Sequence, residues 1–454
     1  MEVIRKMDIF EYKKSVKDKN IAVIGIGISN RPLIKYLSES GAKVTAYDKR
    51  TKEELGEIAD ELSKIGVKLV LGENYLDKLE GEIIFKTPGL RFDHPALLKA
   101  KENGAEVTSE MEVFFDVCPC KIIAVTGSDG KTTTTTLICK ILEKSGYKVW
   151  LGGNIGKPLL CDTEKMQKSD IAVLELSSFQ LHTMRKSPAV AVITNITPNH
   201  LDYHKDYAEY IDAKKNIMRY QGAEDKLIVN AANEVTAEIG KEAKGKLLDF
   251  SAKVDAYISL KDGEIVKNGK PALKISDIKI PGMHNVENYM AAIGATEGLA
   301  KDDAILEVAK TFGGVPHRIE LVRTLDGVKY YNSSIDSSPN RTINTLKVFD
   351  KKVIMIAGGK DKGIPYDDLG KPIEEKVKIL ILIGKTADKI EASLPKDSKV
   401  RVIRCKTYEE VVKTAHALAE NGDIVLLSPA STSFDMFSNF EERGNLFKKL
   451  VEEL

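Results

Sequence analysis

The sequence predicts an α/β protein with three domains, each built around a mostly parallel sheet. Short runs of β-branched residues alternate with segments of helical periodicity along most of the 454 residues. A strand, a helix and a further strand in that order favour parallel sheets, because right-handed crossovers join parallel neighbours. The alternation restarts near residues 110 and 315, so we expect domains at 1–109, 110–314 and 315–454.

The first domain is predicted to begin with a strand and then to alternate regularly. Its β-branched runs have the length of buried strands, and the segments between them place apolar residues at helical spacing. A parallel sheet with covering helices follows from this order. We expect strands at Ile21–Ile26, Lys43–Tyr47 and Glu82–Phe85, and helices at Leu33–Ser40 and His94–Asn103.

The second and third domains are predicted from the same alternation. Gly313-Gly314-Val315-Pro316 separates them, because glycine and proline stop helices. Segment Leu247–Pro281, rich in Lys, Asp and Gly, predicts a small antiparallel excursion within the second domain. The expected strands are Lys121–Val125, Ile171–Leu176 and Val190–Asn195 in the second domain, and Val353–Ala357, Ile379–Gly384, Val400–Arg404 and Asp423–Leu427 in the third.

The bulk composition argues against several classes of protein. Hydrophobic residues make up 43% and charged residues 30%, as in folded globular chains, and a net charge of +1 indicates neither a nucleic-acid nor a membrane surface. Residues 1–20 lack the apolar core of a signal peptide, and no stretch has the ~18 apolar residues that span a bilayer. Five scattered cysteines, including Cys118 and Cys120, indicate plain thiols in a reducing compartment. We therefore expect a cytoplasmic protein with no nucleic-acid or membrane partner.

A glycine-rich loop between an apolar strand and an apolar helix is the sharpest local signal. Glycines let backbone N–H groups close around phosphate oxygens, and the helix that follows presents its positive N-terminal end. Lys131 would neutralise β- and γ-phosphate charge, and Thr132 or Thr133 would offer a hydroxyl to Mg²⁺. Val125 stands where the general pattern has its first glycine, but the flanking strand and helix predict a nucleotide site. The loop reads Thr126-Gly127-Ser128-Asp129-Gly130-Lys131-Thr132-Thr133.

A second glycine cluster follows the first expected strand. Gly25-Ile26-Gly27-Ile28-Ser29-Asn30 is close to a dinucleotide-binding fingerprint, with Asp48 at the end of the next strand, but Asn30 replaces the third glycine. Three interpretations stay open: an NAD site, a tight turn that binds nothing, and a turn that holds the diphosphate of a UDP-linked substrate with Asp48 near the ribose or uracil. The residues alone do not choose among them.

Two polar residues follow expected strands of the second domain. Glu175 ends one apolar run and His200 follows another, and strand ends in open α/β sheets face the ligand crevice. A carboxylate beside a phosphate loop suits Mg²⁺, which prefers hard oxygen ligands. The loop and these two residues therefore predict one shared crevice. Lys214 and Lys215 lie on the next expected helix, where spacing alone predicts solvated positions.

Taken together, these segments resemble the Mur ligase family over almost the whole chain. Any one piece is modest, whereas the ordered set is very specific. The matching pieces, in order, are Gly25–Asn30, Thr87–Gly89, Thr126–Thr133, Gly152–Gly156, Glu175–Gln180, Asn195–Asp202, Tyr210–Lys214, His284–Asn285 with Asn288, Pro316–Arg318, Leu427–Asp435, Asn439–Glu441 and Arg443–Gly444.

The resemblance implies an ATP-dependent amide ligase of bacterial cell-wall synthesis that joins D-glutamate to UDP-N-acetylmuramoyl-L-alanine. The substrate carboxylate would attack the γ-phosphate of ATP to give an acyl phosphate, because a bare carboxylate resists amines. The amine of D-glutamate would then displace phosphate through a tetrahedral intermediate. Positioning and charge neutralisation would be the protein's part. The resemblance also implies a monomer with a Rossmann-like first domain, a P-loop ATPase-like second domain and a Rossmann-like third domain that closes toward ATP.

The same resemblance implies a role for each matching residue. The catalytic centre would comprise Lys131, Glu175, His200 and Lys214. The Mg²⁺ ligands would be Thr132 or Thr133, Glu175, His200 and Lys214, the last as a carbamylated lysine. Contacts with ATP would come from the loop, Asn285, Asn288 and Arg318, the arginine bidentate toward phosphate. The UDP-sugar would be bound by Ser29, Asp48, Arg50, Gly89 and Asn154. D-Glutamate would be bound by Lys362, Ser433, Phe434 and Phe440, with Lys362 pairing a carboxylate.

The chain departs from the family pattern at two places. Asn332–Ser338 stands where the family has an Asp-Ser-Lys-Ala-Thr-like stretch. Ser333 stands there in place of an acid that contacts nucleotide, and Ile335 replaces a lysine. Two alternatives stay open: Asp336 compensates from a shifted position, or the nucleotide contacts differ here. Asn199 stands where an acid often precedes the histidine. We expect these departures to change roles in the third domain more than the overall reaction.

Other functions are weighed against this one. A folylpolyglutamate synthase shares the phosphate loop, but its chain begins with the ATP-binding domain. The alanine-adding muramate ligase has a similar first domain, yet Ser433-Phe434-Asp435 with Phe440 is more similar to the enzyme that adds D-glutamate. An NAD-dependent oxidoreductase would use the first glycine cluster and leave Lys131 unexplained. The departures at Asn332–Ser338 motivate the last alternative, a non-catalytic nucleotide-binding relative.

Overall fold

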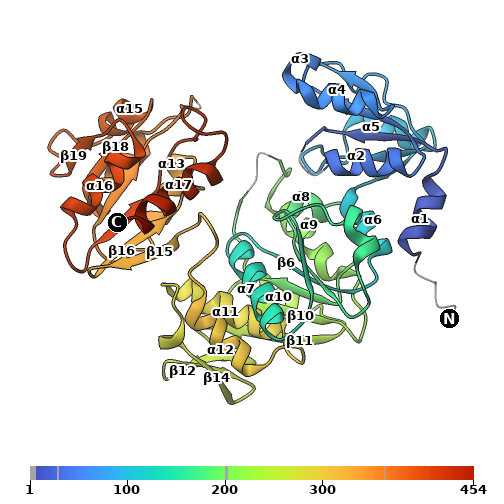
Figure 1. Cartoon of the computed structure of the whole chain (residues 1–454). Helices are drawn as coiled ribbons and strands as arrows, with labels where there is room; N and C mark the ends of the chain where they lie inside the picture. Colours follow the sequence, from blue (N-terminus) through green and yellow to red (C-terminus); the bar gives the residue numbers. More distant parts are fainter. Residues whose placement is uncertain (1–6, 28–29, 200–202, 362) are drawn as a thin grey trace. The chain divides into compact units, whose positions relative to one another are not determined.

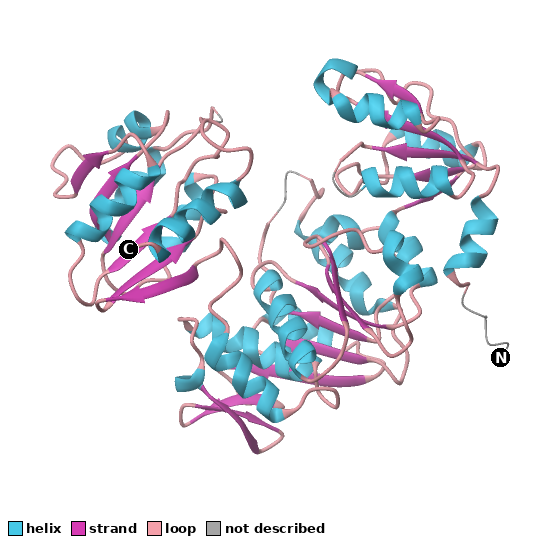
Figure 2. Cartoon of the chain, viewed as in Figure 1, coloured by secondary structure: helices cyan, strands magenta, loops and turns pink. Residues whose placement is uncertain are grey.

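The computed structural model describes residues 7–27, 30–199, 203–361 and 363–454, which form two compact units (Figure 1). One unit comprises residues 1–277 and 283–308 and holds two sheets. The other comprises residues 278–282 and 309–454 and holds one sheet. Helices cover the three sheets, which confirms the predicted α/β class (Figure 2). This division is coarser than the three predicted domains, whose boundaries stay predictions.

The first sheet is parallel throughout, with the order β3-β2-β1-β4-β5. Its central strand is buried over Ile21–Ile24, as expected for a parallel strand covered on both faces. The expected strands are confirmed as β1, β2 and β4, while the short, partly buried β3 and β5 are additional. The bounds are β1 Asn20–Ile24, β2 Lys43–Asp48, β3 Lys68–Leu71, β4 Ile83–Phe85 and β5 Glu106–Thr108.

The helices around the first sheet start at residues suited to that place. The helix expected at His94–Asn103 begins after His94, whose Nδ1 accepts a hydrogen bond from the N–H of Ala96, and proline fits its first turn. One hydrophobic cluster runs from Val23 through Phe114 to Leu174, so the two sheets of this unit share a core. The helices are α1 Ile9–Val16, α2 Asn30–Glu39, α3 Lys52–Leu55, α4 Glu57–Lys64, α5 Pro95–Glu102 and α6 Glu110–Val117.

The second sheet has nine strands in the order β14-β13-β12-β11-β10-β9-β6-β8-β7. The neighbours from β7 to β12 pair in parallel, and β13 and β14 add an antiparallel edge. Three of its strands are those expected from β-branched runs. The bounds are β6 Lys121–Thr126, β7 Val149–Gly153, β8 Ile171–Glu175, β9 Val190–Ile193, β10 Lys226–Asn230, β11 Lys246–Ser251, β12 Ile258–Lys261, β13 Glu264–Lys267 and β14 Lys270–Lys274.

The antiparallel excursion expected at Leu247–Pro281 is only partly correct. β11 pairs in parallel with β10 and therefore continues the main sheet. Antiparallel pairing begins only at β12–β13, where Asp262 and Gly263 turn the chain with positive φ angles. The helices of this part are α7 Lys131–Lys144, α8 Ser178–Leu181, α9 Tyr207–Arg219, α10 Glu234–Gly240, α11 Met283–Ala295 and α12 Asp302–Thr311.

The third sheet has the order β15-β16-β20-β17-β18-β19 and is parallel except for β15. All four expected strands are present. The strands are β15 Glu320–Leu325, β16 Val328–Asn332, β17 Val353–Ala357, β18 Val377–Leu382, β19 Arg401–Arg404 and β20 Ile424–Leu427. The helices are α13 Pro339–Leu346, α14 Gly370–Lys376, α15 Ala387–Ala392, α16 Tyr408–Leu418 and α17 Phe440–Glu452. Within the described residues, no helix is long and apolar enough to cross a membrane.

Candidate active site

The predicted phosphate loop connects β6 to α7, at the carboxyl end of a central strand of the second sheet. Gly127 and Gly130 both have positive φ angles, of 150° and 78°. A Cβ atom on Gly127 would lie 1.9 Å from Oγ1 of Thr194, and one on Gly130 would lie 2.5 Å from Oδ1 of Asn288. Glycine is therefore required at both positions, and the loop presents backbone rather than side chains.

Two lysines lie against this loop. Nζ of Lys131 donates to the carbonyl oxygens of Gly127 (3.0 Å) and Ser128 (2.9 Å). Lys214, on α9, is only 2% exposed, and its Nζ donates to the same Gly127 oxygen at 2.8 Å. Burial, and then the positive charge of Lys131, lower the pKa of Lys214 well below its usual range. The spacing-based expectation of a solvated Lys214 is therefore wrong.

Glu175 ends β8 beside the loop and is 2% exposed. Its Oε2 accepts a hydrogen bond from the hydroxyl of Thr132 at 2.7 Å, and its Oε1 accepts one from the side-chain amide of Asn154 at 2.8 Å. The structure thus brings together a carboxylate, a hydroxyl of the first turn of α7 and an amide that follows β7. Thr133, the other predicted hydroxyl, is half-buried.

Residues after β9 and on α11 hold the loop in place. The side chain of Asn195 accepts from the N–H of Asp129 at 3.0 Å. The hydroxyl of Ser128 lies 2.9 Å from the hydroxyl of Tyr210 on α9. On α11, Asn288 accepts from the hydroxyl of Thr134 at 3.1 Å. Its amide also donates to the side chain of Asn285. The two asparagines predicted to contact ATP are therefore bonded to each other, and Asn288 lies against Gly130 of the loop.

The donors at this site fit a nucleotide and Mg²⁺. The first-turn N–H groups of α7 have no intrahelical partner and point toward the loop, as anion sites at helix N-termini require. Gly127 and Gly130 pack directly against Thr194 and Asn288, so these two side chains fix the course of the loop. Glu175 and Thr132 supply the hard oxygen donors that Mg²⁺ prefers. His200, predicted as a ligand, lies outside the described residues.

An acidic side chain, Asp48, is hydrogen-bonded to the backbone of the first glycine turn. Asp48, at the end of β2, accepts from the N–H of Ile26 at 2.7 Å and from Nε and Nη2 of Arg50 at 2.9 and 2.8 Å. Burial alone would raise the pKa of Asp48, but the hydrogen bonds from Arg50 and Ile26 outweigh it and the pKa falls to about 2. The amide of Asn30 donates to the carbonyl of Ile24 at 2.9 Å, which explains an asparagine where the fingerprint has its third glycine.

The other residues predicted for the UDP-sugar are less gathered. Gly89 is exposed in the loop after β4, and Ser29 lies outside the described residues. The side-chain amide of Asn154 donates a hydrogen bond to Glu175, as described above. Among the described residues of this set, Asp48 and Arg50 are in direct contact, at the carboxyl end of the first sheet.

The residues predicted for D-glutamate and for one ATP contact lie in the second unit. Ser433 is buried, whereas Phe434 is 59% exposed. The ring of Phe440, at the start of α17, meets the ring of His317 edge-on at 6.0 Å. Arg318 is half-buried directly after His317, and Lys362 lies outside the described residues.

The segment that departs from the family pattern follows β16, and several of its residues are buried. Ser333 and Asp336 are both buried, and a carboxylate oxygen of Asp336 accepts from the hydroxyl of Ser428 at 2.8 Å. Burial raises the pKa of Asp336. Its carboxylate therefore belongs to the interior of this unit, which argues against the compensating nucleotide contact suggested for it.

Two buried cations on helices share a sequence signal. On α9, Tyr210, Lys214 and Ile217 fall at helical spacing on the buried face, so a lysine there marks a core position. On α17, Arg443 and Phe447 stand four residues apart on the buried face. Arg443 donates to the hydroxyl and the carbonyl of Ser334 and to the carbonyl of Ser431, and so ties together the two loops beside it. Sequence reasoning missed this positioning role.

A second group with metal-ligating atoms lies near α9. Ligand atoms of His182, His204 and Glu209 lie within 4.8 Å of one another. Burial and the neighbouring His182 lower the pKa of His204 to about 4, so its ring is neutral. Both oxygens of Glu209, however, accept from Arg91 at 3.0 Å. An ion at this group would compete with a bidentate guanidinium pair.

Three domain families match the chain in order. The Mur ligase MurD-like N-terminal domain matches residues 19–109, the Mur ligase middle domain matches 125–296, and the Mur ligase glutamate ligase domain matches 317–431. Each match contains one of the three sheets or most of it. The phosphate loop, Glu175 and Lys214 all fall within the middle-domain match.

Relatives and solved structures agree with these matches. A UDP-N-acetylmuramoylalanine–D-glutamate ligase of Ruminiclostridium cellulolyticum is 54% identical over 98% of both chains, and one of Clostridium perfringens is 52% identical over 99% of this chain and 100% of its own. The solved UDP-N-acetylmuramate-alanine ligase of Thermotoga maritima is 20% identical over 96% of this chain and 99% of its own, with a TM-score of 0.59, which shows a shared fold. The chain therefore belongs to the Mur ligase family.

Proposed function

We propose that the protein joins D-glutamate to UDP-N-acetylmuramoyl-L-alanine with hydrolysis of ATP, as a step of peptidoglycan synthesis. The observation that carries this proposal is the match, over nearly the whole length of both chains, to relatives named as UDP-N-acetylmuramoylalanine–D-glutamate ligases. The geometry of the phosphate loop supports it, because the loop, Lys131 and Glu175 suit phosphoryl transfer.

The residues around the loop receive the following roles. Lys131, now on the loop carbonyls, would turn toward the β- and γ-phosphates and neutralise their charge. Glu175 and Thr132 would hold Mg²⁺ with His200, and the ion would offset the charge that develops as the γ-phosphate moves to the substrate carboxylate. The acyl phosphate that results carries a good leaving group, so the amine of D-glutamate displaces phosphate and forms the amide.

Lys214 is proposed to react with CO₂ and act as a carbamate. An ammonium group beside Mg²⁺ would repel the ion, whereas a carbamate carries a negative charge and an oxygen donor. Carbamylation needs a neutral amine as nucleophile, and burial lowers the pKa of Lys214 in that direction. The contact of Nζ with the carbonyl oxygen of Gly127 supports this proposal, because a carbamate formed there would lie at the phosphate loop.

The remaining roles are assigned to three groups of residues. Asp48 and Arg50, with Ser29, Gly89 and Asn154, are proposed to bind the UDP-sugar. Asn285, Asn288 and Arg318 are proposed to contact ATP. D-Glutamate is assigned to Lys362, Ser433, Phe434 and Phe440, and a monomer is proposed as the working form.

Phosphate release tests the proposal. Purified protein is incubated with ATP and Mg²⁺, and the two substrates are added singly and together. We expect phosphate release only when UDP-N-acetylmuramoyl-L-alanine and D-glutamate are both present. Release with UDP-N-acetylmuramate and L-alanine instead would identify an alanine-adding ligase. Absence of release under every condition would support a non-catalytic relative and contradict the proposal.

A further inference from the structure

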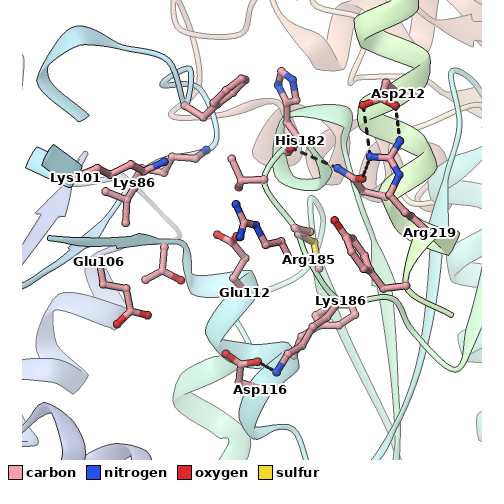
Figure 3. A pocket seen from close by; sticks show the side chains of 18 of the residues that line it. Lys86, Lys101, Glu106, Glu112, Asp116, His182, Arg185, Lys186, Asp212 and Arg219 are labelled. Carbon is pink, nitrogen blue, oxygen red and sulfur yellow. Dashed lines mark hydrogen bonds and ion pairs between the residues drawn. The ribbon is translucent and has the colours of Figure 1, made fainter. Parts of the chain in front are cut away.

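A cavity of about 680 Å³ lies in the first unit, away from the phosphate loop (Figure 3). One wall comes from the segment after β4, from α5 and from β5, which belong to the first sheet. The opposite wall comes from α6, from the segment that follows α8 and from α9. Its volume is that of a small-molecule site, and nothing in the proposed reaction uses it.

The charged residues that line the cavity do not all form ion pairs with one another. Five lysines and arginines line the cavity against four acids. Lys186 pairs with Asp116, and Arg219 pairs with Asp212. The remaining cations are Lys86, Lys101 and Arg185, and none of them has an ion-pair partner among the described residues. Figure 3 shows Lys86 and Lys101 on one side of the cavity and Arg185 beside Glu112 on the other.

Lys86 is the most unusual of these cations. Lys86 is 3% exposed, and among the described residues its ammonium group has one hydrogen bond, 3.5 Å long, to the carbonyl oxygen of Leu90. A buried ammonium without a partner is costly, so such groups pair with an anion or lose their proton. Burial lowers the pKa of Lys86, and the nearby Lys101 lowers it further despite the carboxylate of Glu112. Burial also raises the pKa of Glu112, so that acid is a weak counter-charge.

We propose that this cavity is a second anion site, which binds a small phosphorylated metabolite through Lys86, Lys101 and Arg185. A phosphate group carries up to two negative charges on three oxygens, so three separate cations can each contact one oxygen. A cavity of this size holds more than a free phosphate ion, which favours a metabolite with an organic part.

The position of the site links it to both ligands of the proposed reaction. Lys86 directly precedes the Thr87–Gly89 loop, and it also lines a narrower cavity with Asn30 and Gln180. Asn216 and Arg219, on the other wall, belong to α9, which carries Lys214. A bound metabolite would therefore contact the elements that hold the proposed substrate loop and the buried lysine. We expect it to change the KM for the UDP-sugar.

Calorimetric titration with inorganic pyrophosphate, without divalent ions, tests the binding site. The Lys131→Ala chain serves as the background, so that the phosphate loop contributes little. We expect this chain to bind pyrophosphate, and Arg185→Ala in the same background to weaken Kd at least tenfold, whereas Arg50→Ala, which removes the proposed diphosphate contact of the UDP-sugar, leaves that Kd unchanged. Arg401→Ala is the matched control, because Arg401 is also exposed, has no described ion pair and lies on the third sheet. We expect it to leave Kd unchanged.

Three results would overturn the proposal. They are no binding by the Lys131→Ala chain, equal weakening by Arg185→Ala and Arg401→Ala, and succinate binding as tightly as pyrophosphate, which would indicate a carboxylate site. Lys86→Met gives a second measurement. Methionine has nearly the shape of lysine, so this change removes the charge and keeps the packing. We expect pyrophosphate to raise the thermal midpoint of the Lys131→Ala chain but not that of the same chain carrying Lys86→Met, and an equal rise in both would contradict a role for Lys86.

Discussion

The two glycine turns of the first unit are built alike but carry opposite charge. Each follows a central strand of a parallel sheet and leads into a helix, α2 in one case and α7 in the other. In the first turn the carboxylate of Asp48 accepts from the N–H of Ile26. In the second, the ammonium groups of Lys131 and Lys214 lie on the loop carbonyls. The same backbone motif is thus set for different ligands by the side chains packed against it.

The difference in charge suggests which ligand binds at each turn, the UDP-sugar at the first and ATP at the second. A carboxylate held against the turn repels phosphate but accepts hydrogen bonds from hydroxyl or N–H groups, as the ribose and uracil of a UDP-sugar provide. Arg50, beside it, is free on its solvent side to contact a diphosphate, since its side chain is 38% exposed. The Lys131 ammonium and the backbone N–H groups at the start of α7 favour a triphosphate at the second loop. Predictions that exchange or remove these charges therefore test the comparison directly.

Removal of the loop cation has the largest expected effect. Lys131→Ala leaves γ-phosphate charge without its partner during transfer. We expect kcat to fall roughly 10²–10³-fold, the usual loss when one group that stabilises a developing charge is removed. Steady-state phosphate release measures this. Lys168→Ala removes an exposed cation before β8 and is the control. Near-normal turnover of Lys131→Ala would refute the loop assignment.

Removal of the buried lysine has the next largest expected effect. We expect Lys214→Ala to lower kcat roughly 10–100-fold, as loss of groups that orient a metal site does. Acetate or propionate at high concentration should restore part of the activity, because a free carboxylate can occupy the place of the carbamate. Lys215→Ala is the control, since Lys215 is adjacent but pairs with Glu242 at 2.7 Å. Equal losses for both lysines would speak against a special role for Lys214.

A change to the acid of the first turn should act on one substrate. Asp48→Asn keeps the shape of the side chain and removes its charge. We expect KM for the UDP-sugar to rise roughly 10-fold, the value of one hydrogen bond to a charged group, with KM for ATP unchanged. Initial rates with each substrate varied in turn provide the measurement. An increase confined to KM for ATP would invert the assignment of the two turns.

The same acid predicts a small effect of pH on stability. The pKa of Asp48 is about 2 in the folded protein, below its ordinary value of 3.8, so its contribution to stability is complete above about pH 4 and is lost as pH falls toward 2. We expect the wild type to lose about 1–2 kcal/mol more than Asp48→Asn over this range, since one pKa unit is worth about 1.4 kcal/mol. Urea unfolding at pH 5, 4 and 3 measures the difference. Parallel losses would show that Asp48 is not responsible.

Much of the fold follows from local pattern, and the exceptions have physical reasons. Runs such as Val353–Ala357 are fully buried, and they give strands at the expected bounds. Lys68–Leu71 is only partly buried at a sheet edge, so its signal is weak. The direction of β11 is set by its parallel pairing with β10. The composition of Leu247–Pro281 alone does not predict that pairing.

Some residues of the site can likewise be recognised from local sequence, whereas others are brought there only by tertiary packing. Gly127, Gly130 and Lys131 are recognisable because their chemistry is local, within one strand, loop and helix. Lys214 joins them only through the packing of α9 against the loop, so spacing between motifs could not reveal it. Its place on the apolar stripe of α9 is the signal that was present. Arg443 was missed for the same reason, since its partners Ser334 and Ser431 are far away in sequence.

Direct binding of both nucleotides to both charge variants tests the central claim. ATP and UDP-N-acetylmuramoyl-L-alanine are titrated separately, by calorimetry, into Lys131→Ala and Asp48→Asn. We expect Lys131→Ala to weaken the binding of ATP and to leave the binding of the UDP-sugar unchanged. We expect Asp48→Asn to weaken the binding of the UDP-sugar and to leave the binding of ATP unchanged. If both variants weaken the same ligand, or if Asp48→Asn tightens the UDP-sugar, the two turns do not divide the ligands by charge and the account is contradicted.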